Sequence, residues 1–206
     1  MSGKGNNYQQ IILIAVQLLE KTGEFPTSLG ALSGEISGLS AKEVAGDFQN
    51  IEALHTAVLD HATVLLADAM GHAMATADAD DPRAQLLALG TAFFDWGFAN
   101  RTLFSLLAKA LFDPRASEGE VLARHRHAIR DLVERKLHES QTRGLISDEL
   151  PVPILLTNTQ SLILGISSML VQDRLDPWYK GDKIDLHTLC HRMVELQIDL
   201  MFHNRD

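Results

Sequence analysis

The chain has a single cysteine, Cys190, and therefore cannot form a disulfide within itself. Its longest apolar runs are short, such as residues 162–166, and predict no membrane span. No apolar signal core follows the first lysine. We therefore expect a cytoplasmic protein without membrane association. Its 206 residues, 46% of them hydrophobic, are enough to bury a core without disulfides.

Sustained alternation of apolar and polar residues is also missing, so no β-strand is predicted. Apolar residues recur at helical spacing instead, and glycine, proline and capping residues divide the chain into about nine helices. We expect an all-α fold with helices over residues 8–21, 26–37, 40–46, 51–75, 82–99, 101–112, 117–142, 151–172 and 186–202.

Basic residues are scarce at the N-terminus. The chain carries a net charge of −9, and there is no arginine before Arg83. Residues 1–60 contain three lysines and seven acidic residues, a net charge of −4. This balance argues against a protein that coats nucleic acid through bulk charge.

Three short helices followed by a long one are typical of a helix-turn-helix domain. Residues 27–29 (TSL), 39–40 (LS) and 48–54 (FQNIEAL) resemble the signature of the TetR family of transcription regulators. Residues 92–114 are similar to the TetR subgroup with a WHG-type C-terminal domain. In that subgroup's motif only Gly165 matches, because Gln160 stands where tryptophan is expected and Leu164 where histidine is expected.

The resemblance implies a helix-turn-helix domain over residues 1–48 and a larger helical domain over 49–206 that binds a ligand and dimerises. It implies a ligand-responsive regulator, typically a repressor, whose third helix enters the DNA major groove. The positions that match the family's DNA contacts, together with polar neighbours, are Thr27, Ser28, Ser40, Lys42 and Gln49.

Four positions depart from that pattern. Ala41, Ala45, Asp47 and Ile51 stand where the family typically has lysine, tyrosine, histidine and lysine. These residue types contact phosphate, and Asp47 would be repelled by it. We therefore expect weak binding to a DNA operator. The alternative is a TetR-like dimer that has lost DNA binding and acts as a small-molecule sensor or protein-binding regulator.

Aromatic residues gather in the predicted fifth and sixth helices. The predicted fourth helix has a largely apolar face that comprises Leu54, Val58, His61, Leu65, Ala69 and His72. The apolar eighth helix contains the polar Asn158. Polar residues in apolar helices need partners when buried. Together these features predict an apolar cavity within the fourth to eighth helices for a small apolar or amphipathic ligand. The candidate ligand-binding residues are Phe93, Trp96, Phe104, His125 and Asn158. Ordinary core packing is the alternative for each aromatic residue.

The last two helices predict a homodimer. Residues 154–171 are apolar on nearly every side, more than one chain's core can bury, and Gly165, Ser167 and Ser168 permit close approach. On the ninth helix, the apolar stripe comprises Leu186, Leu189, Cys190, Met193, Leu196 and Leu200.

Catalytic and metal-binding patterns are sparse. His187 and His191 lie four residues apart, which suits a metal pair, but no cysteine cluster or Glu-x-x-His pattern accompanies them. We interpret them as surface polar residues and expect no metal and no cofactor. A Gly-x-Ser-x-Gly elbow is also absent from the sequence, and we expect no enzyme activity.

Overall fold

The computed structural model describes residues 4–35, 41–112, 120–172 and 184–202. All regular structure in these ranges is helical, which confirms the all-α prediction. The helices are α1 (Lys4–Thr22), α2 (Leu29–Glu35), α3 (Ala41–Asp47), α4 (Ile51–Thr76), α5 (Pro82–Ala99), α6 (Arg101–Phe112), α7 (Glu120–Thr142), α8 (Val152–Gln172) and α9 (Leu186–Phe202).

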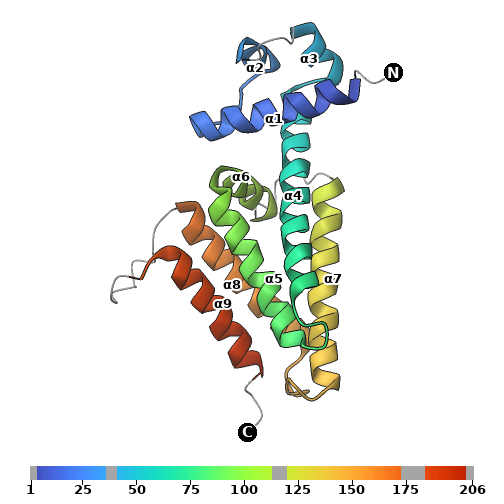
Figure 1. The fold of residues 1–206 in the computed structure, drawn as a ribbon, viewed down its shortest axis with the longest axis vertical. Helices are drawn as coiled ribbons and strands as arrows, with labels where there is room; N and C mark the ends of the chain where they lie inside the picture. The colour runs from blue at the N-terminus through green and yellow to red at the C-terminus, as the bar shows by residue number, and fades with distance from the viewer. Residues whose placement is uncertain (1–3, 36–40, 113–119, 173–183, 203–206) are drawn as a thin grey trace.

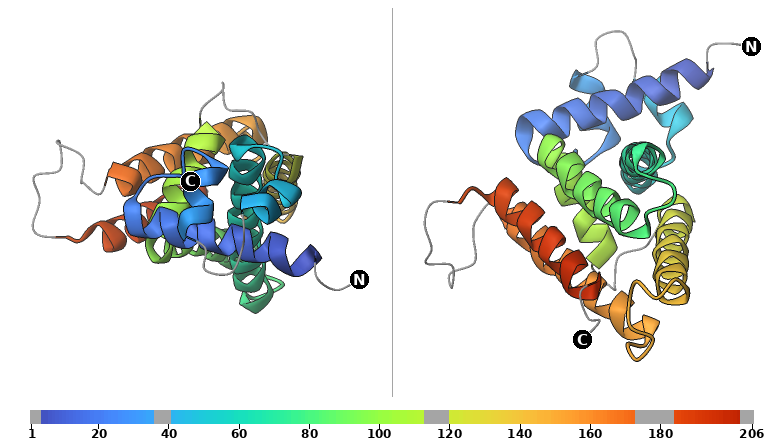
Figure 2. Two further views of the ribbon diagram at one scale, coloured as in Figure 1. Left: turned by 90° about the horizontal axis from the view of Figure 1, so that it is seen from above. Right: turned by 60° about the horizontal axis from the view of Figure 1, so that its bottom comes forward.

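The helices form a small head and a larger body joined by α4 (Figure 1). In the head, α1 packs against α3 and α4, and α2 packs against α3. In the body, α4 packs against α5, α6 and α7. The pair α8 and α9 lies side by side at one edge of the body in every view, with α9 packed on α5 (Figures 1 and 2).

Local capping chemistry sets several helix ends as predicted. The Asn50 side chain accepts a hydrogen bond of 2.8 Å from the Ala53 amide and caps α4. Pro82 opens α5, where the missing N–H costs nothing. Gly144 follows α7 with a φ of 64°, a conformation that glycine adopts without steric cost.

The buried face of α4 differs from the one expected from its apolar spacing. The buried residues follow Leu54 at four-residue intervals, through Val58 and Leu66 to Met70. Leu65 is exposed, and so is His72. The prediction that His72 lies on the buried face was wrong. Apolar residues occur on more than one side of α4, and the packing of α5, α6 and α7 determines which side is buried.

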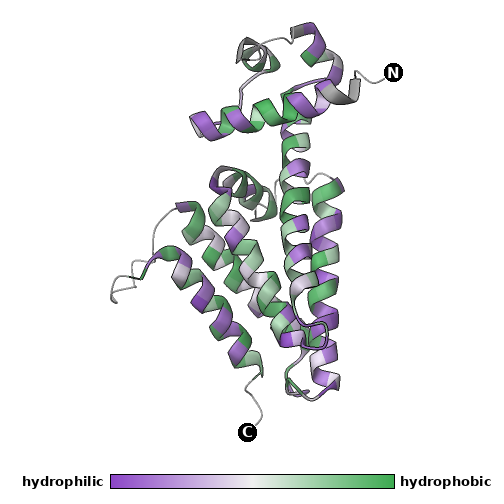
Figure 3. Ribbon diagram, in the orientation of Figure 1, coloured by the Kyte–Doolittle hydropathy of each residue, from purple (hydrophilic) through white to green (hydrophobic). Residues whose placement is uncertain are grey.

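The two sides of α9 are likewise distinct. Cys190, Val194 and Ile198 are buried against the body, whereas Leu196 and Leu200 are exposed. Hydrophobic and hydrophilic residues alternate along this helix (Figure 3). Of the predicted apolar stripe, Leu196 and Leu200 therefore lie on the outer side of α9, whereas Cys190 is buried and Leu186 and Met193 pack against the core.

By length and composition, α8 could cross a membrane, alone among the helices of the described ranges. Most of it is not buried within the chain. Its outer side carries Ile154 and Leu164 together with the polar Asn158 and Ser161. The core helix of a soluble protein passes the same test, so this feature is weak evidence for a membrane span.

Candidate functional site

The head presents a short helix with little positive charge. Val44 of α3 and Phe48, just after it, are buried, and the Phe48 ring stacks on Tyr8 of α1 at 4.8 Å. This anchor leaves Lys42 and Ala45 of α3 exposed. Glu43 is exposed and Asp47 is partly exposed on the same helix, so two acidic residues accompany the single lysine of α3.

The candidate DNA-binding residues lie around this helix. Thr27 and Ser28 are exposed before α2, and the Ser28 hydroxyl caps α2 by accepting a hydrogen bond of 3.1 Å from the Ala31 amide. Gln49 is exposed beyond the C-terminal end of α3. Ser40 lies outside the described residues.

The body contains a cavity of about 620 Å³ that is lined by residues of α4, α5, α6, α7, α8 and α9. Cavities of this size accommodate drug-sized ligands. Most of its wall is apolar, with Phe93 and Phe94 from α5, Leu156 and Ile163 from α8, and Ile198 from α9. Of the predicted ligand residues, Phe93 and His125 line it.

One wall of the cavity is basic. His125, Arg126, His127 and Arg130 of α7 all contribute to the lining. The lining contains no aspartate or glutamate among the described residues. A mainly apolar cavity with cationic groups on one side suits an amphipathic molecule that carries an anionic group.

Three predicted ligand residues lie elsewhere. Trp96 and Phe104 are buried but do not line the cavity. The Phe104 ring packs against the Gly97 side of α5 and meets the Phe93 ring edge-on at 5.4 Å. Asn158 is exposed on the outer side of α8. These three do not line the cavity, because α5, α6 and α8 turn other residues toward it.

Asp60 places a carboxylate between α4 and α7. Its Oδ1 atom is buried without a hydrogen-bond partner in the described part of the chain. Burial raises the pKa of the Asp60 carboxyl above its ordinary value, while the nearby Arg124 and His125 favour its charged form.

A second cluster lies on the surface between α5 and α9. His187 and His191 both contact Asp95 of α5, a residue that the sequence analysis did not single out. Asp95 is 92 residues from His187, so no local sequence motif could have connected them.

The head and body together define a class of protein, a small head of helices α1 to α3 on a larger helical body with a cavity. A protein of unknown function from Rhodococcus sp. RHA1 is similar in structure, with a TM-score of 0.73, 23% identity, and coverage of 95% of this chain and 93% of that one. A bacterial regulatory protein of the TetR family from Rhodococcus RHA1 has a TM-score of 0.66 and 18% identity, and 98% of each chain is covered.

The transcriptional regulator FadR from Bacillus subtilis, in a complex with stearoyl-CoA, has a TM-score of 0.68 and 16% identity over 93% of this chain and 97% of that one. No protein-family model and no curated protein matched the chain. This chain has the TetR fold, and these similarities establish the fold alone.

Proposed function

We propose that this protein is a ligand-responsive transcription regulator whose effector is an amphipathic anion with a long apolar part. The observation that carries the proposal is the cavity, with its apolar wall and its basic side on α7. The stearoyl-CoA complex of the similarly folded FadR supports this ligand class, because an acyl thioester of coenzyme A combines an apolar chain with anionic phosphates.

The cavity also suits regulation because of the helices that form it. Thr63, Leu66 and Met70 of α4 line it, and α4 begins directly after the head. A ligand that favours one position of α4 would therefore change the position of the head. Such a ligand changes DNA affinity only to the extent that it binds with different affinity to the two conformations of the protein, which differ in the position of α4.

Stearoyl-CoA should stabilise the protein. At a concentration one hundred times its Kd, binding adds about 2.7 kcal/mol to the free energy of unfolding. For a chain of this size, that raises the melting temperature by roughly 5–10 °C. Differential scanning fluorimetry with stearoyl-CoA, stearate and free coenzyme A measures the effect, and we expect the largest shift with the compound that has both parts.

Arg130→Glu should reduce that shift, since Arg130 lines the cavity and an acidic side chain there repels the anionic group. Arg135→Glu is the matched control, because Arg135 is exposed on the same helix but does not line the cavity. Equal shifts in both variants, or no shift in the unaltered protein, would contradict the proposed ligand class.

DNA binding by the head should be weak and should depend little on salt. The phosphate backbone supplies most non-specific affinity, and the exposed side of α3 offers Lys42 beside Glu43. Replacing Ala45 with tyrosine and Asp47 with histidine should strengthen binding to an arbitrary duplex by about tenfold or more. Fluorescence anisotropy at 50 and at about 200 mM salt measures both effects.

Asp68→His on α4 is the control for this prediction, because it makes the same change of charge at an exposed position outside the head. Tight, steeply salt-dependent binding by the unaltered protein would contradict the prediction. If the protein binds its ligand while neither it nor the double variant binds DNA, the result favours the second candidate, a TetR-like sensor that acts without DNA. The acidic head is the observation that favours this candidate.

We also propose that the protein is a homodimer through α8 and α9. These helices lie side by side at the edge of the body, and each has an exposed apolar side. Ile154, Leu196 and Leu200 are 61%, 59% and 60% exposed, unusually high values for large apolar side chains on neighbouring helices. In a dimer with two-fold symmetry, the exposed apolar sides of α8 and α9 would be buried against the same surface of a second copy of the chain.

A further inference from the structure

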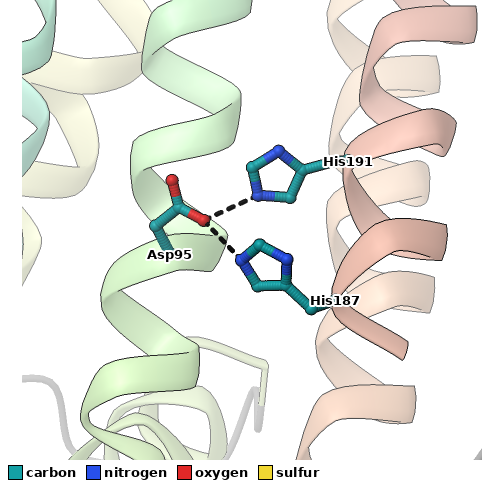
Figure 4. A group of neighbouring side chains, drawn as sticks. All are labelled: Asp95, His187 and His191. Atoms are coloured by element: carbon teal, nitrogen blue, oxygen red, sulfur yellow. Dashed lines mark hydrogen bonds and ion pairs between the residues drawn. The ribbon is translucent and has the colours of Figure 1, made fainter. Parts of the chain in front are cut away.

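Two histidines and one aspartate converge on a single point between α5 and α9 (Figure 4). The Nε2 atom of His187 lies 2.9 Å from Oδ1 of Asp95, and the Nε2 atom of His191 lies 2.6 Å from the same oxygen. The two imidazole rings are 4.4 Å apart at an angle of 30°. Both histidines lie in the first two turns of α9, on the side that faces α5.

This geometry concentrates three electron-donating groups in one place. Two neighbouring imidazolium rings would repel each other at this separation, and a single carboxylate oxygen compensates only one positive charge. Neutral imidazole is the form that binds metals. In these contacts each Nε2–H donates a hydrogen bond to Asp95. With the ring proton on Nδ1 instead, the same Nε2 atom would bind a metal ion beside the carboxylate.

The distances are close to those of a metal site. Zinc–nitrogen and zinc–oxygen bonds of about 2.0–2.2 Å place tetrahedral ligand atoms about 3.4 Å apart. The donor atoms here all lie within 4.8 Å of one another. The two contacts to Asp95 would lengthen by about 0.5–0.8 Å. Side-chain rotation allows this, because Asp95 and His187 are about half exposed.

We propose that Asp95, His187 and His191 form a binding site for a borderline divalent transition-metal ion such as Zn²⁺. Two imidazoles and one carboxylate are ligands that such ions accept, whereas Mg²⁺ and Ca²⁺ prefer oxygen alone. The exposure of Asp95 and His187 leaves room for water in the remaining coordination positions.

The described residues around the site supply nitrogen and oxygen ligands alone. Cys190 lies between the two histidines in sequence, but its side chain is fully buried and is not part of the cluster.

The metal would connect the two helices. Asp95 belongs to α5 and both histidines belong to α9, and these helices also form part of the cavity wall. A bound ion that bridges them should stabilise the folded protein by mass action. It should bind less well in acidic solution, because protons and the metal ion compete for the same imidazole nitrogens.

The test uses the untagged full chain after dialysis against a chelator. Isothermal titration calorimetry with Zn²⁺ should give one ion per chain, and Co²⁺ should give a visible spectrum without the strong charge-transfer band of a thiolate ligand. Asp95→Asn and His191→Gln should each weaken Zn²⁺ binding by about 100-fold or more. Loss of a residue that only orients the metal ligands costs up to about 100-fold, and loss of a ligand itself should cost at least as much. His138→Gln is the matched control, because His138 is an exposed histidine of α7 and is not one of the three proposed ligands.

Melting temperatures measured with and without Zn²⁺ complete the test. Zn²⁺ should raise the melting temperature of the unaltered protein and of His138→Gln, and of neither ligand variant. Circular dichroism in chelator shows whether each variant is folded, and His187→Gln replaces any that is not. Any of three results would overturn the proposal. These are an unchanged Zn²⁺ affinity in the ligand variants, no saturable Zn²⁺ binding at 100-fold excess over protein, and binding of Mg²⁺ as tight as that of Zn²⁺.

Discussion

Gly97→Ala should lower the free energy of unfolding by about 1–3 kcal/mol, although alanine is the better helix former. A Cβ atom at Gly97 would lie 2.7 Å from Cδ2 of Phe104 and 2.9 Å from Cδ2 of Leu170. Phe104 is 1% exposed and Leu170 is buried, so neither side chain can move away without displacing others. The added methyl group would push α5 away from α6 and α8.

Gly71→Ala on α4 is the matched control. Nothing lies within 4 Å of a Cβ atom at this exposed helical position. Here alanine should stabilise the protein by about 0.5–1 kcal/mol, because only the helix preference changes. Urea unfolding at one fixed protein concentration measures both variants. Gly97→Ala with a stability equal to or above that of the unaltered protein would show that the packing around Phe104 is looser than described.

Leu196→Glu combined with Leu200→Glu should convert the protein from a dimer to a monomer. Both leucines are about 60% exposed on the outer side of α9, and a two-fold interface buries each of them twice. Burying a leucine side chain contributes roughly 1.5–3 kcal/mol. Four lost leucines, replaced by four carboxylates, should weaken dimerisation by at least about 1,000-fold.

Val64→Glu is the control, since Val64 is a similarly exposed apolar residue on α4, away from α8 and α9. Size-exclusion chromatography with light scattering at tens of micromolar measures the mass of each protein. The unaltered protein and Val64→Glu should both be dimers. A monomeric unaltered protein, or a double variant that remains dimeric, would refute this interface.

Cavity, head and dimer surface were each predicted in outline from the sequence, but with different success at the level of single residues. Phe93 and His125 line the cavity, whereas Trp96 and Phe104 pack elsewhere. His125 lies in the polar α7 and Phe104 in α6, whereas Phe93 and Trp96 lie in α5, which is apolar on several sides. Helical periodicity cannot choose between such sides, so the rotation of α5 and α8 in the core decides which residues face the cavity.

The order of the helices and several of their ends followed from the sequence alone, whereas α1 begins at Lys4 and not at Tyr8 as predicted. Asn50, Pro82 and Gly144 act through hydrogen bonds and backbone angles within a few residues. These helix ends therefore depend only on residues that are close in sequence. The acidic character of the head is equally independent of the fold, because it depends only on which residues are present.

Tertiary structure alone decided which sides of the helices meet. Leu65 and Leu66 are adjacent in sequence, yet the first is exposed and the second is buried. Asp95 meets His187 and His191 only because α9 packs on α5 with one rotation out of several that its apolar residues would allow. A contact across more than 90 residues has no local signature, since it depends on the summed packing of every helix between them.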